Sequence, residues 1–419
     1  MKPLRPVFLL GGAHTPFIGK FHPDFIWKGH PDFGKRRNPT IEEHLHKAVR
    51  DALAATGVPA SAVRKGYVGN FTGEIFAQQG HLGSSLAAAD PAFRNKAFSR
   101  VEGACASGGL ALIAAVDAVG AGFDVALAAG VEVQTTLSAK EGADALARAA
   151  HYPTQRSIDP FTFPCMFARR TKAYLETFGL SEEDLAEVVL KAYANASKNP
   201  YAHMRAFKMT PEYARAASEK NPRFLENPQY RDWMKVSDCS QVSDGASCAL
   251  LVSEAGLRSL GKSRDQAVEI AAYGHATAPL AEDVDLLDLA TTRAAAAEAY
   301  ADSGTAPEAI QVAEVHDCFS IAEILMYEAI GFAPRGRGIG IVKDGTTTLA
   351  GSRPVNTGGG LLAFGHPVGA TGVKQAVEIW RQMKGLCGDY QIRRTPAWGL
   401  TANMGGDDRT AVVTIYRNT

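Results

Sequence analysis

The stretch Val101–Gly109, with the sequence VEGACASGG, decides the fold class because two structural patterns meet in it. Its small residues lead directly into an apolar segment, from about 106 to 120, that predicts a buried helix. The run Phe123–Ala129 follows and has no polar face, which is typical of a strand buried on both sides. A strand, a buried helix and a second buried strand in alternation indicate α/β layers with a parallel sheet.

The same alternation extends in both directions from this stretch. Strand-like runs lie at 6–10 and near 65–70, and a capping box at Thr40–Glu43 opens an amphipathic helix that Gly57 closes. From about 131 to 235 the strand signals disappear, although a helix begins after Ser181, and we interpret this region as an insertion over the core. Strand signals return at 246–252, 267–273 and 311–315, and an alanine-rich helix is expected around 294–298.

A second glycine-rich turn, Gly365–Gly372, also precedes an apolar helix, so we expect a duplicated domain, although no clear residue-level repeat is visible. The expected organisation is an N-terminal half made of residues 1–130 and 236–262, an inserted loop domain at 131–235, and a C-terminal half at 263–419.

Composition narrows the possible partners and compartments. The 419 residues carry 44 basic and 44 acidic side chains, so no overall charge favours nucleic acid or an anionic membrane. No apolar run approaches the length of a membrane span. The six cysteines show neither CxxC pairs nor the density of a secreted disulfide scaffold, so we expect reduced thiols in a cytoplasmic protein.

Cys105 is the candidate nucleophile. It stands where a strand gives way to a helix, and we expect the unpaired N–H groups and the dipole of the helix to lower its pKa. A cysteine among small residues more often serves packing. Two further segments favour chemistry: Glu314–Phe319, EVHDCF, at the end of an expected strand, and Gly365–Gly372, GHPVGATG.

These motifs resemble the thiolase superfamily over nearly the whole chain, from Gly12–Phe17, GAHTPF, to Gly405 and Gly406. The resemblance implies an α/β thiolase fold in which two similar halves form a five-layered αβαβα core with an inserted loop domain. It also implies a homodimer or homotetramer.

The tetrapeptide His316–Phe319, HDCF, is similar to that of the sterol-carrier-protein type of thiolase. Most thiolases carry a second catalytic cysteine in a C-terminal Cys-x-Gly motif, where this chain has Asn403–Gly405, NMG. The tetrapeptide brings in Cys318 as an alternative thiol. His14 replaces a more usual arginine, and the sequence assigns that change no consequence.

The resemblance also implies roles. His366 accepts the proton of Cys105, and Cys318 exchanges the proton at the α-carbon of the substrate. His316 and His366 donate to the enolate oxygen, and backbone N–H groups of Cys105 and Gly405 hold the tetrahedral oxyanion. Acyl-CoA and CoA are the expected substrates, and no metal or other cofactor is expected because thioesters are already activated. A partner protein that shares acyl-CoA intermediates is a further expectation.

Several alternatives stay open. An acyl-carrier ketosynthase, a hydroxymethylglutaryl-CoA synthase type and a catalytically silent acyl-CoA-binding scaffold are the rival classes. Arg169, Arg170 and Lys172 form either a solvated helix face or a site for CoA phosphates, and the remaining cysteines are expected in the core. Acyl chain length and reaction direction leave no readable pattern.

Overall fold

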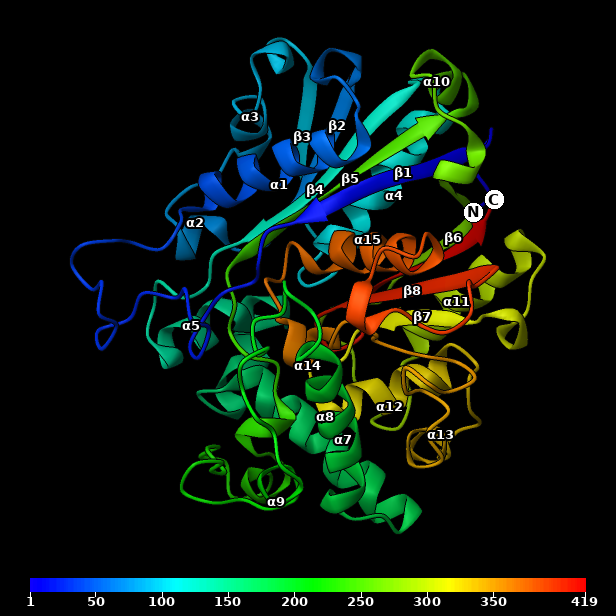
Figure 1. Ribbon diagram of the computed structural model, residues 1–419. Coiled ribbons are helices and arrows are strands. Elements are labelled where there is room, and N and C mark those ends of the chain that lie inside the picture. The colour runs from blue at the N-terminus through cyan, green and yellow to red at the C-terminus, as the bar shows by residue number, and fades with distance from the viewer.

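Nine strands make one continuous sheet in the order β3-β2-β4-β5-β1-β6-β9-β8-β7 in the computed structural model, which describes residues 1–419 (Figure 1). The first five strands are β1 (Val7–His14), β2 (Lys65–Gly69), β3 (Ala97–Val101), β4 (Val125–Glu132) and β5 (Gly245–Ser253). The other four are β6 (Val268–Thr277), β7 (Val312–Val315), β8 (Trp398–Gly405) and β9 (Thr410–Asn418).

The two parts of this sheet repeat the same topology. In the first, β2 lies parallel to β4, while β4 and β1 are both antiparallel to β5. In the second, β7 lies parallel to β8, while β8 and β6 are both antiparallel to β9. The strand β3 is extra and lies parallel to β2 at the edge. The duplication that the two glycine-rich turns suggested is therefore present as topology, and a short antiparallel contact between β1 and β6 joins the two parts.

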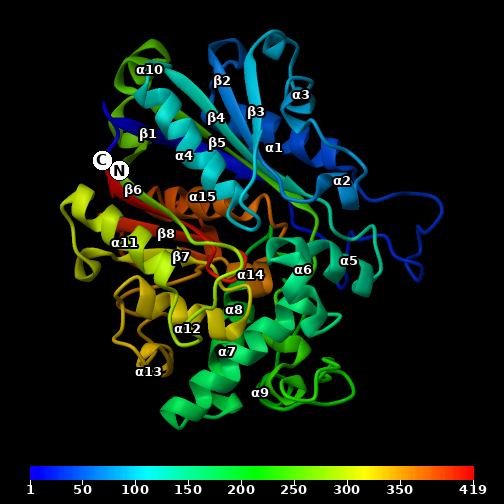
Figure 2. The same cartoon turned by 180° about the vertical axis from the view of Figure 1, so that it is seen from behind.

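Four long helices build the layers around the two parts of the sheet. They are α1 (Ile41–Thr56), α4 (Ser107–Gly120), α11 (Ala290–Ser303) and α15 (Thr371–Met383). The first covers the outer face of the N-terminal strands and α11 covers the outer face of the C-terminal strands, while α4 and α15 pack on each other between the two (Figures 1 and 2). The expected αβαβα layering is confirmed.

Local sequence explains why these elements form. Thr40 and Glu43 complete the capping box of α1, and Gly57 ends the helix in the left-handed conformation. Every residue of β4 and of β5 is buried, as their uninterrupted apolar sequences predict. By contrast β3 is an edge strand with partly exposed residues, and its short, mixed sequence gives no comparable signal.

The glycine-rich turns let the two central helices approach each other at their N-terminal ends. A Cβ atom on Gly108 would lie 2.7 Å from the backbone nitrogen of Gly372, and one on Gly372 would lie 2.1 Å from that of Gly109. Side chains larger than glycine have no room at these positions. These glycines therefore serve backbone packing between the two halves and bring the loops that precede α4 and α15 together.

After the last two residues of β4, the region 131–235 contains helices and no further named strand, and it lies below the layered core in Figure 1. Its helices are α5 (Ala139–Leu146), α6 (Tyr152–Gln155), α7 (Thr162–Phe178), α8 (Glu182–Ala196) and α9 (Pro211–Arg215). The remaining short helices are α2 (Gly73–Phe76), α3 (Leu82–Leu86), α10 (Glu254–Ser259), α12 (Ser320–Ala329), α13 (Gly338–Lys343) and α14 (Gly360–Phe364). The boundaries expected for the three units stay a prediction.

Three buried hydrophobic clusters fill the spaces between these layers. One lies between α1 and the N-terminal strands, a second surrounds α4 and α15, and the largest joins the C-terminal strands to the region 131–235. The third cluster holds the inserted region against the C-terminal half. None of the helices has the length and apolar character needed to cross a membrane.

Candidate active site

Three loops from distant parts of the chain bring one thiol and two imidazoles together. The sulfur of Cys105 and one nitrogen each of His316 and His366 all lie within 4.8 Å of one another. The two imidazole rings meet edge to face, with centroids 5.1 Å apart. Cys105 precedes α4, His366 precedes α15 and His316 follows β7, so the two halves of the fold meet at this point.

Cys105 is partly exposed, yet the atoms packed around its sulfur dominate its ionisation. Burial raises the pKa of the Cys105 thiol to about 12, although backbone N–H groups of Gly406 and of Cys105 itself act in the opposite direction. The expectation that the start of α4 lowers this pKa is therefore wrong, because loss of solvent outweighs the favourable amides. At neutral pH the resting nucleophile is a thiol.

His366 lies beside Cys105 with a defined hydrogen bond. Its Nδ1 is 2.8 Å from the hydroxyl of Thr371, and that hydroxyl donates to the carbonyl oxygen of Pro367 at 3.1 Å. This arrangement is satisfied when the His366 proton is on Nδ1, which leaves the lone pair on Nε2. Burial lowers the pKa of His366 to about 3, so the imidazole is neutral and can accept a proton.

His316 is buried and has a different neighbour. Its Nδ1 lies 3.1 Å from the side-chain amide nitrogen of Asn403, which comes from β8. Burial, followed by the nearby His366, lowers the pKa of His316 well below its usual value. Both imidazoles are consequently neutral at physiological pH, and the site carries no permanent positive charge from them.

Cys318 and Asp317 stand at the start of α12. The backbone carbonyl of Cys318 accepts a hydrogen bond from the backbone N–H of Ser240, and the ring of Phe319 stacks on Phe167 with centroids 4.5 Å apart. Burial raises the pKa of Cys318, and the charge that Cys105 would carry raises it further. The two thiols are therefore near enough to influence each other, and both are protonated at neutral pH.

Asp317 connects the segment that carries His316 to the segment that precedes His366. Its carboxylate accepts hydrogen bonds from the backbone N–H groups of Leu361 at 2.6 Å and Leu362 at 3.4 Å, at the start of α14. Gly360, with φ of 62°, makes room for this carboxylate. Asp317 thus ties the HDCF tetrapeptide to the loop that carries His366, a contact that the sequence spacing does not reveal.

Comparison with known proteins identifies the family. The thiolase N-terminal domain model matches residues 30–222, and the model described as thiolase C-terminal domain-like matches residues 272–418. An acetyl-CoA acetyltransferase of Methanothermobacter thermautotrophicus is 35% identical over 366 residues, covering 87% of this chain and 91% of that relative. The chain belongs to the thiolase family.

Two further thiolase-related proteins extend the comparison. Sterol carrier protein 2 of Gallus gallus is 30% identical over 385 residues, covering 88% of this chain and 66% of that protein. A solved structure titled Ltp2-ChsH2(DUF35) aldolase superposes with a TM-score of 0.77 at 22% identity, covering 100% of this chain and 99% of that one. The chain is thus similar both to an acetyl-CoA acetyltransferase and to a sterol carrier protein 2.

Gly405 and Gly406 both lie beside the loop that carries Cys105. The amide that favours a charge on Cys105 together with its own is that of Gly406, whereas Gly405 packs against the backbone of Gly103 and Ala106. Gly406 has φ of 65°, which suits glycine. The donor role expected of Gly405 stays a prediction, and Gly406 joins the candidates.

The histidine that replaces an arginine before Thr-Pro acquires a structural role. His14 bonds to the buried carboxylate of Glu378 at 3.0 Å, and its ring meets Phe364 and Tyr201 edge to face. Burial lowers the pKa of His14, despite the opposing effect of Glu378. Since Phe364 lies two residues before His366, the His14 ring packs behind the loop that carries His366 in this thiolase.

Within the basic cluster of α7, Arg170 fits neither of the two interpretations that the sequence left open. Arg170 is fully buried and donates to Asp407 at 2.6 Å and to the carbonyl oxygens of Asp285, Leu286 and Asp288. Because Arg170 is fully buried and its Nε and Nη1 donate within the protein, it belongs neither to a solvated helix face nor to an exposed phosphate site. Arg169 and Lys172 are partly exposed.

The other cysteines follow the expectation of a packing role. Cys165, Cys248 and Cys387 are buried, and Cys239 is partly exposed beside Phe319. Cys105, His316 and His366 are the group whose donor atoms come close enough to hold a metal ion. One thiolate and two imidazoles are a set that zinc accepts, and the same three residues are those for which the thiolase resemblance implies roles in catalysis.

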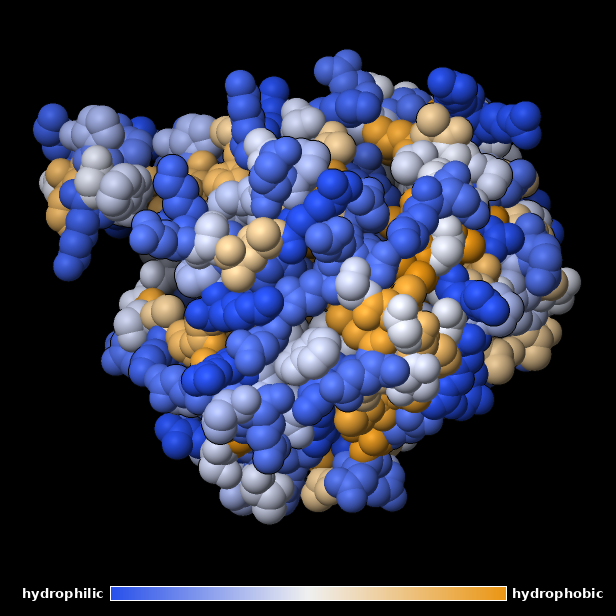
Figure 3. Space-filling model, turned by 90° about the horizontal axis from the view of Figure 1, so that it is seen from below, coloured by the Kyte–Doolittle hydropathy of each residue, from blue (hydrophilic) through white to orange (hydrophobic).

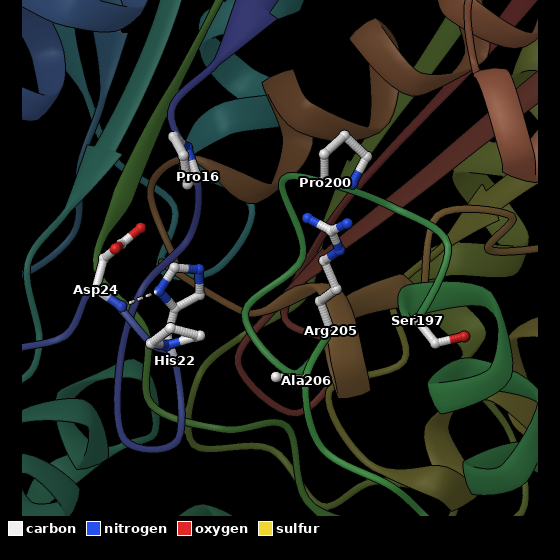
Figure 4. A pocket seen from close by; sticks show the side chains of 8 residues that line it. Pro16, His22, Asp24, Ser197, Pro200, Arg205 and Ala206 are labelled. Atoms are coloured by element: carbon white, nitrogen blue, oxygen red, sulfur yellow. Dashed lines mark hydrogen bonds between the residues drawn. The ribbon is translucent and has the colours of Figure 1, made fainter.

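A surface cavity lies between the loop that follows β1 and the loop that follows α8. A cavity of about 310 Å³ lies between Pro16, His22 and Asp24 on one side and Pro200 and Arg205 on the other (Figure 4). Its wall does not include Cys105, His316 or His366. The face below the core is mainly hydrophilic, with smaller hydrophobic areas between the polar ones (Figure 3).

Proposed function

We propose that this thiolase cleaves 3-oxoacyl-CoA with CoA, or runs the reverse condensation, through an acyl group carried on Cys105. The observation that supports this most strongly is the convergence of the Cys105 sulfur with nitrogens of His316 and His366 within 4.8 Å. A nucleophile, a base and a hydrogen-bond donor in one small space are what acyl transfer requires.

The first half-reaction uses the resting thiol. The Cys105 sulfur attacks the 3-oxo carbon while His366 takes the thiol proton, so no free thiolate is needed despite its pKa of about 12. The tetrahedral oxyanion forms near the amide of Cys105 and that of Gly405, with the Gly406 amide as the further candidate donor. It collapses by breaking the bond between C2 and C3, and the bonding electrons pass into the acetyl-CoA enolate.

Cys318 then gives its proton to C2 of the enolate. Its raised pKa suits a group that must hold a proton at neutral pH until the enolate forms. At this stage His366 is protonated, Cys318 is a thiolate and Cys105 is a thioester. The incoming CoA thiol gives its proton to Cys318 and attacks the thioester, and the departing Cys105 sulfur recovers its proton from His366.

Acyl-CoA and CoA are the proposed substrates, and the reaction as written uses no metal or further cofactor. The acetyl-CoA acetyltransferase among the relatives supports this substrate class. Assembly as a homodimer or homotetramer, and association with a protein that shares acyl-CoA intermediates, belong to the same proposal.

The test separates the two half-reactions in the Cys318→Ala variant. Acyl exchange between acetyl-CoA and labelled CoA needs Cys105 and His366 but no proton at C2, so we expect it within about threefold of the parent. Thiolysis of a panel of 3-oxoacyl-CoA esters should fall by about 10²- to 10⁴-fold, as losses of a general acid do.

Cys239→Ala is the matched control, because this cysteine lies beside Phe319 but has no assigned step. Undiminished thiolysis in Cys318→Ala would refute the role of Cys318. Absence of thiolysis and of acyl exchange in the parent protein would instead favour the silent acyl-CoA-binding alternative.

A further inference from the structure

Asn403 occupies the position at which most thiolases have their second cysteine, and its amide group is held by the backbone on two sides. Its Oδ1 accepts a hydrogen bond from the backbone N–H of Gly109 at 3.0 Å, and its Nδ2 donates to the carbonyl oxygen of Cys105 at 3.1 Å. A backbone N–H cannot accept and a carbonyl cannot donate. These two partners therefore fix which end of the amide is oxygen and which is nitrogen.

The fixed nitrogen end also faces His316. Asn403 Nδ2 lies 3.1 Å from Nδ1 of His316, and an amide NH2 group can only donate. Nδ1 must then be the accepting nitrogen, so the single proton of the neutral imidazole resides on Nε2. His316 is neutral at physiological pH because burial favours the uncharged ring.

His366 is arranged in the opposite sense. Its Nδ1 faces Thr371, whose hydroxyl proton goes to the carbonyl oxygen of Pro367, so the ring proton lies on Nδ1 and the lone pair on Nε2. Neither Nε2 has a hydrogen-bond partner within the protein. The two neighbouring imidazoles therefore differ: Nε2 of His316 is a donor, whereas Nε2 of His366 is an acceptor.

We propose that Asn403 is a positioning residue that holds His316 in the Nε2–H form, so that His316 donates a hydrogen bond to the substrate oxygen and leaves the base role to His366 alone. The assignment deepens the proposed function and rests on it for its catalytic meaning. The enolate oxygen gains charge when the C2–C3 bond breaks, and a donor already oriented toward that charge lowers the barrier. An imidazole in the other tautomer would turn a lone pair toward it.

The direct measurement is nuclear magnetic resonance of the full chain with ¹⁵N-labelled histidine at neutral pH. The ring nitrogens of a neutral histidine differ in chemical shift according to which one carries the proton. His316 is assigned by the resonances lost in His316→Gln. We expect its proton on Nε2, and a proton on Nδ1 in the parent protein would overturn the proposal without any activity measurement.

Asn403→Leu removes the amide while keeping a side chain that branches at the same carbon. We expect His316 to lose its uniform tautomer. The rate of carbon-carbon cleavage should fall by about tenfold to 10²-fold, which is less than the roughly 10²- to 10³-fold cost of losing a donor outright, because the His316 ring remains in place. Acyl exchange, which forms no enolate, should fall by less than about threefold.

Asn199→Leu is the matched control. Asn199 is also buried, accepts from the backbone N–H of Tyr201 at 3.0 Å and donates to the carbonyl of Gly358 at 3.2 Å, but it reaches no histidine. The control should leave the His316 resonances in place. Equal losses of cleavage in both variants, with unchanged His316 resonances in Asn403→Leu, would show a packing effect and overturn the proposal.

Failure of the proposed function is distinguishable from failure of this assignment. The parent tautomer is read without turnover, so a protein that is inactive on 3-oxoacyl-CoA but carries the proton on Nε2 would contradict only the proposed function. A protein that cleaves 3-oxoacyl-CoA but carries the proton of His316 on Nδ1 would contradict only the role of Asn403.

Discussion

The two halves of this thiolase contact each other through side chains on the equivalent strands β4 and β8, but the two side chains differ. At the end of β4, Glu132 accepts a hydrogen bond from the backbone N–H of Gly369, in the loop that opens α15. In β8, Asn403 accepts one from the backbone N–H of Gly109, at the start of α4. Each half therefore holds the N-terminal end of the central helix of the other half, or the loop just before it.

The difference lies in what else the two side chains contact. Glu132 accepts further hydrogen bonds from Asn70, Phe71 and Thr72, so its carboxylate is fully engaged in holding backbone and amide groups. Asn403 has a donor left over and directs it to His316. In this duplicated fold, the Glu132 contact only holds backbone and amide groups, whereas the equivalent residue Asn403 also contacts a candidate catalytic histidine.

The largest effect on activity should come from His366→Ala, in the loop that Glu132 holds. Loss of the base should lower the rate of Cys105 acylation by about 10²- to 10⁴-fold, because the thiol cannot ionise by itself at neutral pH. Stopped-flow or quenched measurement of acetyl transfer from acetyl-CoA checks this. His46→Gln in α1 is the control, and a His366→Ala protein that acylates at the parent rate would identify a different base.

A second effect concerns the thiol at the contact between α4 and α15. Since the pKa of Cys105 is raised to about 12, its thiolate fraction should increase about tenfold per pH unit from pH 7 to pH 10. The rate of iodoacetamide labelling of Cys105, followed by mass spectrometry, should rise in the same proportion. A plateau near neutral pH would instead indicate the lowered pKa that the helix start alone suggests.

The smallest expected effect belongs to the structural contact, in Glu132→Gln. Burial raises the pKa of Glu132 to about 7, so between pH 4.5 and 7 the folded protein binds a proton that the unfolded chain has lost. Stability should therefore decrease as pH rises through this window, by on the order of 3 kcal/mol at most.

The Glu132→Gln variant cannot titrate at this position. Its unfolding free energy, measured by urea denaturation, should depend less on pH between 4.5 and 7, while its thiolysis rate changes by less than about tenfold. An unchanged slope would show that the carboxyl group is ionised throughout. A loss of activity as large as that of His366→Ala would show that the Glu132 contact is needed for catalysis and is not only structural.

The sequence was sufficient for features that depend on neighbouring residues. The capping box at Thr40, the left-handed Gly57 and the apolar strands β4 and β5 follow from local composition, and all are confirmed. The HDCF and GHP motifs predict where site residues lie in the chain because the surrounding strand and turn signals are local too.

Features that depend on residues far apart in the chain could not be predicted from the sequence. Asn403 bonds to Gly109, 294 residues away, and Arg170 bonds to Asp407, 237 residues away, so no spacing rule connects them. The pKa of Cys105 was misjudged for a related reason. A helix start is visible in the sequence, whereas the packing that excludes water from the sulfur comes from several elements at once.

The most direct test of the account is the mass of the intact protein after incubation with acetyl-CoA, followed by peptide mapping. We predict one added acetyl group, located on Cys105, that is removed when CoA is supplied and that fails to form in Cys105→Ala. Cys248→Ala, which removes a buried thiol outside the site, should acetylate as the parent does. Acetylation of another residue, or an unmodified Cys105 under conditions of measurable thiolysis, would contradict the central claim.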